Sequence, residues 1–224
     1  MRQESIGRLS LPGGRLVAGD PYVTEDEREQ FVQRLGAQEV EVIAARAVIA
    51  EDHERVAALV LRVGSRPILE WAMATVPGQD VSTIEGEEVF GYGVDAGTGA
   101  FGSVEAMQTA ERVLDADDGM LEDPVSTALL SDGGNTRSAV VIAPEAGAVP
   151  VAVCSSGWGD GVYPTWLGLD ESGDVMVVVT DFTLTGGPSS TPPTQEPPVS
   201  GLVESRPTSL FRRRRTPCQL RQSS

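Results

Sequence analysis

The sequence predicts an α+β fold, built mainly on an antiparallel or mixed β-sheet with two or three short helices. Three observations support this fold class. β-Branched and aliphatic residues cluster in short runs, turn-forming residues separate the runs, and strands do not alternate with helices as they do in parallel sheets. The chain has 224 residues, 40% of them hydrophobic, which is enough for the core of a single domain.

Strand-like runs occur in two groups that are separated by a helical stretch. The predicted strands cover 15–19, 39–50, 55–63, 68–76 and 88–94 in the first group, and 138–143, 149–155, 162–169 and 175–183 in the second. The glycine-dense residues 95–99 predict a turn after the first group. Residues 170–174 predict the turn of a hairpin, because Gly173 can adopt a positive φ.

Helices are predicted at three places. Thr24 and Glu27 have the spacing of a capping box, so a helix is expected to begin at Thr24 and to end at Gly36. A second, amphipathic helix is expected over 103–114, where Ser103 can cap its first turn, and a third short helix over 124–130.

A change in composition predicts where the folded domain ends. Residues 1–186 are expected to form one globular domain, and residues 187–224 a disordered tail rich in proline, serine and arginine. Such a segment buries too little apolar surface to offset the entropy lost on ordering. The tail is either a genuine arm or linker, or the product of readthrough or a frameshift, because GC-rich codons read out of frame yield the same composition.

The charge of the chain narrows the classes of partner. The formal net charge is -16, so the folded domain is expected to repel nucleic acid and to favour basic or cationic partners. No run approaches the roughly 20 apolar residues of a membrane span, and no signal-peptide pattern opens the chain. Two cysteines and one histidine argue against a disulfide scaffold and a zinc site, and favour a cytoplasmic location.

Aspartates beside glycine-rich bends are the candidate site residues. Asp20, Asp95 and Asp160 each occupy such a bend, and the aromatic residues Trp158 and Tyr163 flank the last of them. We expect these five residues to form a ligand or partner site. The alternative is structural, since an aspartate that bonds to nearby backbone amides forms turns of the same composition.

Oxygen ligands at sharp bends also allow a hard divalent cation. Under this hypothesis Asp20, Asp95 and Asp160 would hold the ion, together with Asp181 near a strand end. No other cofactor is evident, since the glycine-rich segments lack the spacing and the lysine of phosphate-binding motifs. No set of acid, base and nucleophile can be assembled around the only histidine, His53, so an enzyme is not favoured.

Three longer segments indicate a family. Residues 11–21, 90–99 and 155–166, together with Trp71 and 77–80, resemble the bacterial family known as domain of unknown function 4241. The resemblance extends over the whole of the predicted domain and implies neither an activity nor catalytic residues. The sequence therefore predicts a noncatalytic binding or interaction domain. The alternative is a hydrolase or sensor that uses a hard divalent cation.

Overall fold

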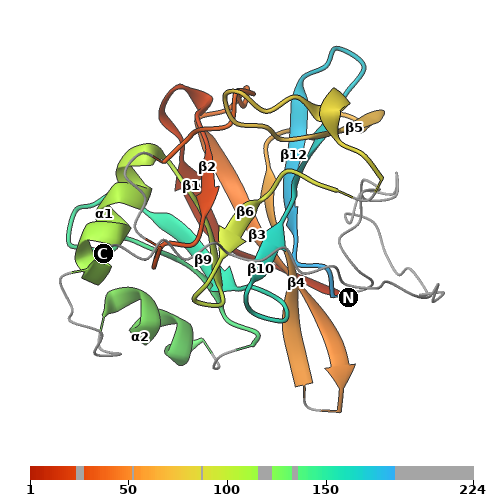
Figure 1. Cartoon of the computed structure of the whole chain (residues 1–224). Coiled ribbons are helices and arrows are strands. Elements are labelled where there is room, and N and C mark those ends of the chain that lie inside the picture. Colours follow the sequence, from red (N-terminus) through yellow and green to blue (C-terminus); the bar gives the residue numbers. More distant parts are fainter. Residues whose placement is uncertain (24–27, 52, 87, 116–122, 133–135, 185–224) are drawn as a thin grey trace, which may run out of the picture.

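The computed structural model describes residues 1–23, 28–51, 53–86, 88–115, 123–132 and 136–184. Within these residues the chain forms three antiparallel sheets and two α-helices (Figure 1). This confirms the predicted antiparallel sheet structure with short helices, with two helices in place of three. The start of the first predicted helix and the predicted tail over 187–224 lie outside the described residues.

The largest sheet has six strands, and every neighbouring pair in it is antiparallel. In spatial order its strands are β1 (Arg2–Ser10), β3 (Glu39–Ala50), β4 (His53–Arg62), β12 (Val175–Asp181), β11 (Thr165–Leu169) and β5 (Glu70–Met73). The predicted hairpin turn joins β11 to β12. There the Asp170 carboxylate accepts hydrogen bonds from the backbone N–H groups of Ser172 and Asp174, at 2.8 and 3.0 Å.

A four-stranded sheet and a separate pair of strands complete the β-structure. The four strands, in spatial order, are β2 (Val17–Gly19), β7 (Thr98–Gly102), β9 (Val151–Ser155) and β8 (Ala139–Ile142). The pair, which we name the β6–β10 ribbon, consists of β6 (Tyr92–Val94) and β10 (Gly161–Tyr163). Two 3-10 turns, Pro12–Gly14 and Val81–Thr83, lie in the connections between strands.

Helices α1 (Val104–Asp115) and α2 (Pro124–Ser131) confirm two of the predicted helices. Each is capped by the side chain that precedes it. The Ser103 Oγ accepts a hydrogen bond from the Ala106 N–H at 3.1 Å, and the Asp123 carboxylate accepts one from Ser126 at 2.8 Å. No helix in the described part of the chain is long and apolar enough to cross a membrane.

Two hydrophobic clusters divide the domain into three layers. Val42, Leu61 and Ala152 belong to the cluster between the six-stranded and four-stranded sheets. Val153 and Met107 belong to a second cluster, which lies between the four-stranded sheet and the helices. Since neighbouring side chains of a strand point to opposite faces, Ala152 and Val153 place the four-stranded sheet in the middle layer.

The predicted helix from Thr24 to Gly36 is wrong for the part that the structure describes. Its backbone N–H groups bond to distant segments in place of the preceding turn of a helix. Phe31 donates to the Leu16 carbonyl at 3.0 Å, and Leu35 donates to the Gly14 carbonyl at 2.9 Å. Long-range partners therefore override the local capping signal, and the described part of the segment forms neither a helix nor a strand.

Two predicted strands also need correction. The segment 162–169 is divided by Pro164 between β10 and β11, because proline has no N–H to donate to a sheet. The segment 88–94 forms a strand only at its end, as β6. Neither β1 nor β7 is among the predicted strands, and β7 begins inside the predicted turn over 95–99.

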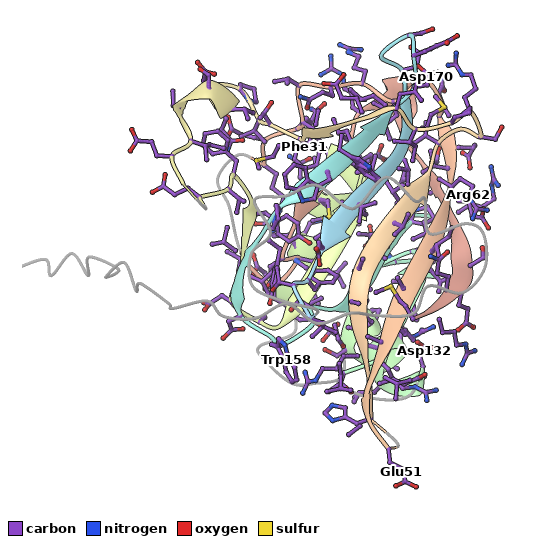
Figure 2. The ribbon with its side chains drawn as sticks, turned by 90° about the vertical axis from the view of Figure 1, so that its right-hand side faces the viewer. Phe31, Glu51, Arg62, Asp132, Trp158 and Asp170 are labelled. Carbon is purple, nitrogen blue, oxygen red and sulfur yellow. The ribbon has the colours of Figure 1, made fainter. Side chains whose placement is uncertain are left out.

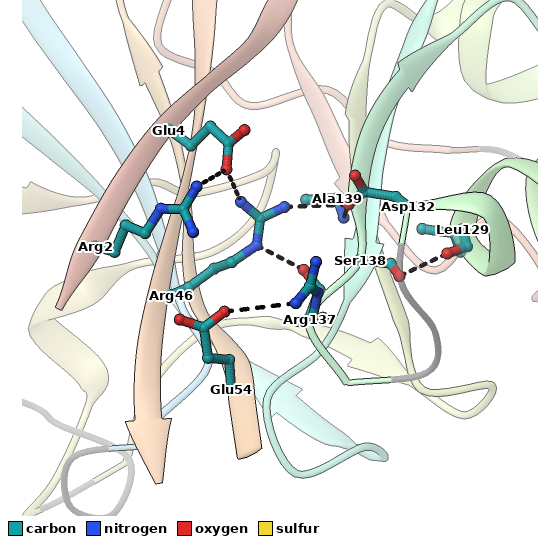
Figure 3. Close-up of polar contacts among 9 residues, drawn as sticks. All are labelled: Arg2, Glu4, Arg46, Glu54, Leu129, Asp132, Arg137, Ser138 and Ala139. Atoms are coloured by element: carbon teal, nitrogen blue, oxygen red, sulfur yellow. Dashed lines mark hydrogen bonds and ion pairs between the residues drawn. The ribbon is translucent and has the colours of Figure 1, made fainter. Parts of the chain in front are cut away.

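A buried arginine ties the six-stranded sheet to residues between α2 and β8 (Figure 3). Arg46 of β3 has 5% of its surface exposed. Its guanidinium pairs with Glu4 of β1 at 2.6 Å and with Asp132 after α2 at 3.1 Å, and donates to the Arg137 carbonyl at 2.7 Å. We name this group the arginine clamp. Each of the three guanidinium nitrogens therefore has a hydrogen-bond partner, as a buried charged group usually does.

Candidate functional site

The structure brings the aspartates of the predicted site to one loop, residues 95–97. Asp20 follows β2, and its carboxylate accepts hydrogen bonds from the backbone N–H groups of Asp95 and Ala96, at 3.0 and 2.7 Å. The Asp160 carboxylate accepts the next one, from Gly97, at 3.1 Å. Three consecutive amides thus donate to two carboxylates that are distant in sequence, and this fixes the end of the β6–β10 ribbon.

Asp20 is the buried member of this group, with 1% of its surface exposed. Its second oxygen accepts a hydrogen bond from the Tyr22 N–H at 3.0 Å. Burial raises the pKa of Asp20 above its ordinary value, and the three backbone N–H groups and the nearby Arg28 oppose that rise. The contacts of Asp20 are those of a side chain that organises loops.

The other aspartates of the cation hypothesis differ from one another in exposure and contacts. Asp95 and Asp160 are exposed, and Asp181 accepts a hydrogen bond from the Thr183 N–H at 2.8 Å. Burial raises the pKa of Asp181, which opposes its ionisation. The described residues contain no group of three or more histidine, cysteine, aspartate or glutamate side chains that could hold a metal ion. The cation site stays a prediction.

The two aromatic residues of the predicted site lie in different environments. Tyr163 is buried, donates a hydrogen bond to the Gly159 carbonyl at 2.7 Å, and meets the Phe182 ring edge-on at 5.1 Å. Trp158 is 55% exposed at a loop tip (Figure 2), with the Arg55 guanidinium 4.4 Å from its ring centre. Of the two, only Trp158 offers side-chain surface to a partner.

A cleft of about 540 Å³ opens beside the β6–β10 ribbon. We name it the β6 cleft. Its lining comes from five separate parts of the chain: β2, the segment after Arg28, the connection after β5, β6 with the residue before it, and the start of β11. The lining residues are Ala18, Glu29, Phe31, Ala74, Val76, Gln79, Gly91, Tyr92, Gly93 and Thr165. This cleft is not predictable from the sequence, because no single motif marks it.

The segment that carries Glu29 and Phe31 forms one wall of the cleft, and Arg28 anchors this segment. Its guanidinium is buried, pairs with Glu111 of α1 at 3.0 Å and donates to the Asp20 carbonyl at 2.9 Å. The segment is therefore held to the helix layer and to the loop-organising aspartate at the same time. This arrangement fixes the wall although the segment is not helical.

The connection after β5, which bonds to the segment after Arg28 through Val32 and Thr75, is also held by polar contacts. Gln33 and Thr75 exchange two hydrogen bonds of 3.2 Å each, and the Gln79 side chain accepts one from the Val76 N–H at 3.0 Å. At the floor, the hydroxyl of Thr165 bonds to that of Thr180 at 2.8 Å. The cleft is thus preformed, as small-ligand and peptide sites usually are.

β6 contributes mainly backbone to the cleft. Gly91 and Gly93 are exposed and have no side chain, while Tyr92 between them directs its phenol inward. A Cβ on Gly99 of β7 would lie 2.8 Å from the Tyr92 hydroxyl oxygen, so that hydroxyl is packed against the middle sheet. Burial raises the pKa of Tyr92 well above its ordinary value. Glu29 is consequently the one side chain in the lining that is charged at neutral pH.

The fold and the cleft define a class: a layered antiparallel β-domain that has helices on one face and a cleft beside a two-stranded ribbon. A family model described as "Protein of unknown function (DUF4241)" matches residues 9–180. The chain belongs to this family, as the resemblance noted above indicates. The family has no assigned activity. No curated protein and no solved structure matches the chain.

Proposed function

We propose that this protein is a noncatalytic binding or interaction domain of the cytoplasm, and that its ligand occupies the β6 cleft. One observation carries the proposal. The cleft is preformed, has the volume of typical ligand sites, and combines apolar side chains with exposed backbone and a single carboxylate. Such a lining suits recognition, whereas catalysis of proton or acyl transfer requires an acid, a base or a nucleophile placed together.

The polar side chains of the lining support a binding role. The Thr165 hydroxyl already bonds to Thr180, and the Gln79 carbonyl oxygen already accepts from Val76. Both are committed to the walls, which leaves them poorly placed to act on a substrate. Glu29 is exposed at the cleft and its charge favours a basic or cationic ligand, in keeping with the net charge of the chain.

A substitution at Gly93 tests whether the cleft binds ligands. An added Cβ at Gly93 meets no atom within 4 Å, and its backbone needs no positive φ, so Gly93→Trp should fold and should place a bulky side chain at the lining of the cleft. Gly36→Trp is the matched control, because Gly36 is equally open and does not line the cleft.

The readout is the perturbation of backbone amide NMR signals by a library of amine, amide and dipeptide fragments. Hits should perturb the signals of cleft residues in the unmodified protein and in Gly36→Trp, and should leave those signals unperturbed in Gly93→Trp. Fragments that perturb only surfaces away from the cleft, or that bind Gly93→Trp unchanged, would contradict the proposal.

A further inference from the structure

Among the residues that the structure describes, no strand pairs with the second edge of β6. β6 pairs with β10 along its other edge, through Tyr92 with Tyr163 and Gly93 with Val162. Within the described residues, the backbone of 91–93 has no hydrogen bond to any segment besides β10. The cleft is lined by these three consecutive residues, and two of them are glycines, so β6 presents mainly backbone to it.

The sequence of this edge lets another backbone approach it. Gly93 carries no side chain, and a Cβ there would meet no atom within 4 Å, so nothing at this residue obstructs a neighbouring strand about 4.8 Å away. Gly91 is required by β10 itself, since a Cβ there would lie 2.5 Å from the Tyr163 carbonyl oxygen. The cleft volume of about 540 Å³ leaves room for a few extended residues, at roughly 3.3 Å of length for each residue.

The edge strand β1 of the six-stranded sheet has features that hinder pairing with a further strand, and the β6 edge lacks them. β1 carries Arg2, Glu4 and Arg8, and an irregularity between Ser5 and Gly7 interrupts its pairing with β3. Charges and bulges of this kind discourage the addition of strands. The β6 edge has neither a charged residue nor a proline between 91 and 93.

The charge of the cleft specifies the kind of strand that would fit. Glu29 is the charged side chain of the lining, and Phe31, Ala74 and Val76 provide apolar surface near it. Lysine and arginine combine an apolar stem with a charged end, so this combination of surfaces favours a basic side chain over an acidic or a purely aliphatic one.

Building on the proposed function, we propose that the β6 cleft binds an extended peptide segment as an added strand along the free edge of β6, and that a lysine or arginine of this segment pairs with Glu29. The bound peptide would exchange backbone hydrogen bonds with residues 91–93, the mode known as β-strand addition. Those bonds supply affinity independent of sequence, and Glu29 supplies the selectivity.

Blocked pentapeptide pools test the proposal, with valine, isoleucine, threonine or serine at the flanking positions and lysine, norleucine or glutamate at the centre. We expect the lysine pool to bind best and the glutamate pool at least tenfold more weakly. Glu29→Gln should remove the preference for lysine over norleucine. Gly93→Trp should lose binding, whereas Gly36→Trp should retain it.

Backbone methylation separates strand addition from side-chain binding alone. The best peptide is resynthesised with N-methyl groups on the amides of one edge or of the other edge. Methylation of the edge that faces β6 should weaken binding at least tenfold, and methylation of the outer edge should change it little. Equal binding of both methylated peptides, or failure of every pool to bind, overturns the strand-addition proposal. If fragments still bind the cleft in that case, the proposed function stands without it.

Discussion

The arginine clamp and the β6 cleft are both places where distant segments meet, but their polar groups differ in how fully they are satisfied. In the clamp, all three guanidinium nitrogens of Arg46 have partners from other elements. In the cleft, the outward edge of 91–93 has no backbone partner among the described residues. Buried polar groups are usually paired, so the clamp belongs to the architecture and the cleft is suited to a partner from outside.

The largest effect is expected from breaking the clamp. Arg46→Met should lower the free energy of unfolding by about 2–3 kcal/mol, because Glu4 and Asp132 lose a charged partner but remain partly hydrated. Urea unfolding measures the change. Arg112→Met is the control, since Arg112 and Glu145 form an exposed pair whose loss should leave the free energy of unfolding nearly unchanged. Equal losses in the two variants would show that the clamp is not a special contact.

A smaller loss is expected at the loop that ends the ribbon. Asp20→Asn should lower the free energy of unfolding by about 1–2 kcal/mol. The amide NH₂ group of asparagine must face at least one of the backbone N–H groups from which the carboxylate accepts a hydrogen bond. Asp160→Asn can keep its acceptor toward Gly97 and is exposed, so its cost should be within about 0.5 kcal/mol. Denaturant titration of the two variants measures the difference. Similar costs would mean that Asp20 does not organise the loop.

The pH dependence of Tyr22 tests how the same loop region is joined to α2. Its hydroxyl bonds to Ser126 at 2.6 Å, so Tyr22→Phe should cost about 1 kcal/mol at pH 8. Burial raises the pKa of Tyr22 to about 12, above the value of about 10 in an unfolded chain. A raised pKa gives stability that is complete below pH 10 and is lost as the pH rises toward 12.

The gap between the unmodified protein and Tyr22→Phe should therefore shrink between pH 8 and pH 11 in urea unfolding. Tyr92 and Tyr163 are present in both proteins, so their contributions to the alkaline loss cancel in the comparison. A gap that stays constant over this range would refute the assigned role of burial at Tyr22.

The smallest effect is expected in the cleft. Gly93→Ala should change the free energy of unfolding by no more than about 0.5 kcal/mol, since the added methyl group meets no atom within 4 Å. Gly99→Ala should cost about 1–3 kcal/mol, because its methyl group would lie 2.8 Å from the Phe182 ring and the Tyr92 hydroxyl oxygen. Chemical denaturation compares the two. A loss above about 1 kcal/mol at Gly93 would assign the cleft edge a structural role.

The sequence predicts those elements whose signals are local. β3 and β4 consist of long aliphatic runs, and α1 and α2 follow capping side chains, so pattern and structure agree there. β7 is not predicted from the sequence, because its small residues favour the prediction of a turn. Gly99 and Gly102 are needed in that strand because the Phe182 ring and α1 lie against them.

The candidate site is predictable only in part for the same reason. Glycine-flanked aspartates indicate organised loops, and the structure does bring Asp20 and Asp160 to one loop. The β6 cleft gathers residues from five parts of the chain, most of them apolar or glycine, so its existence depends on tertiary packing. The predicted helix over 24–36 shows the same limit, since bonds to Leu16 and Gly14 determine the course of its described part.

The hairpin of β3 and β4 has a consequence for behaviour in concentrated solution. β1 pairs with β3 only as far as Arg46, and β12 pairs with β4 only as far as Ala58. The end of the hairpin therefore projects beyond its neighbouring strands toward Glu51 (Figure 2). Val48 and Ile49 are exposed on this projection. Mutual repulsion at a net charge of -16 keeps molecules apart at neutral pH. Near the isoelectric pH of about 4.4 that repulsion vanishes, and self-association is expected to begin at this hairpin.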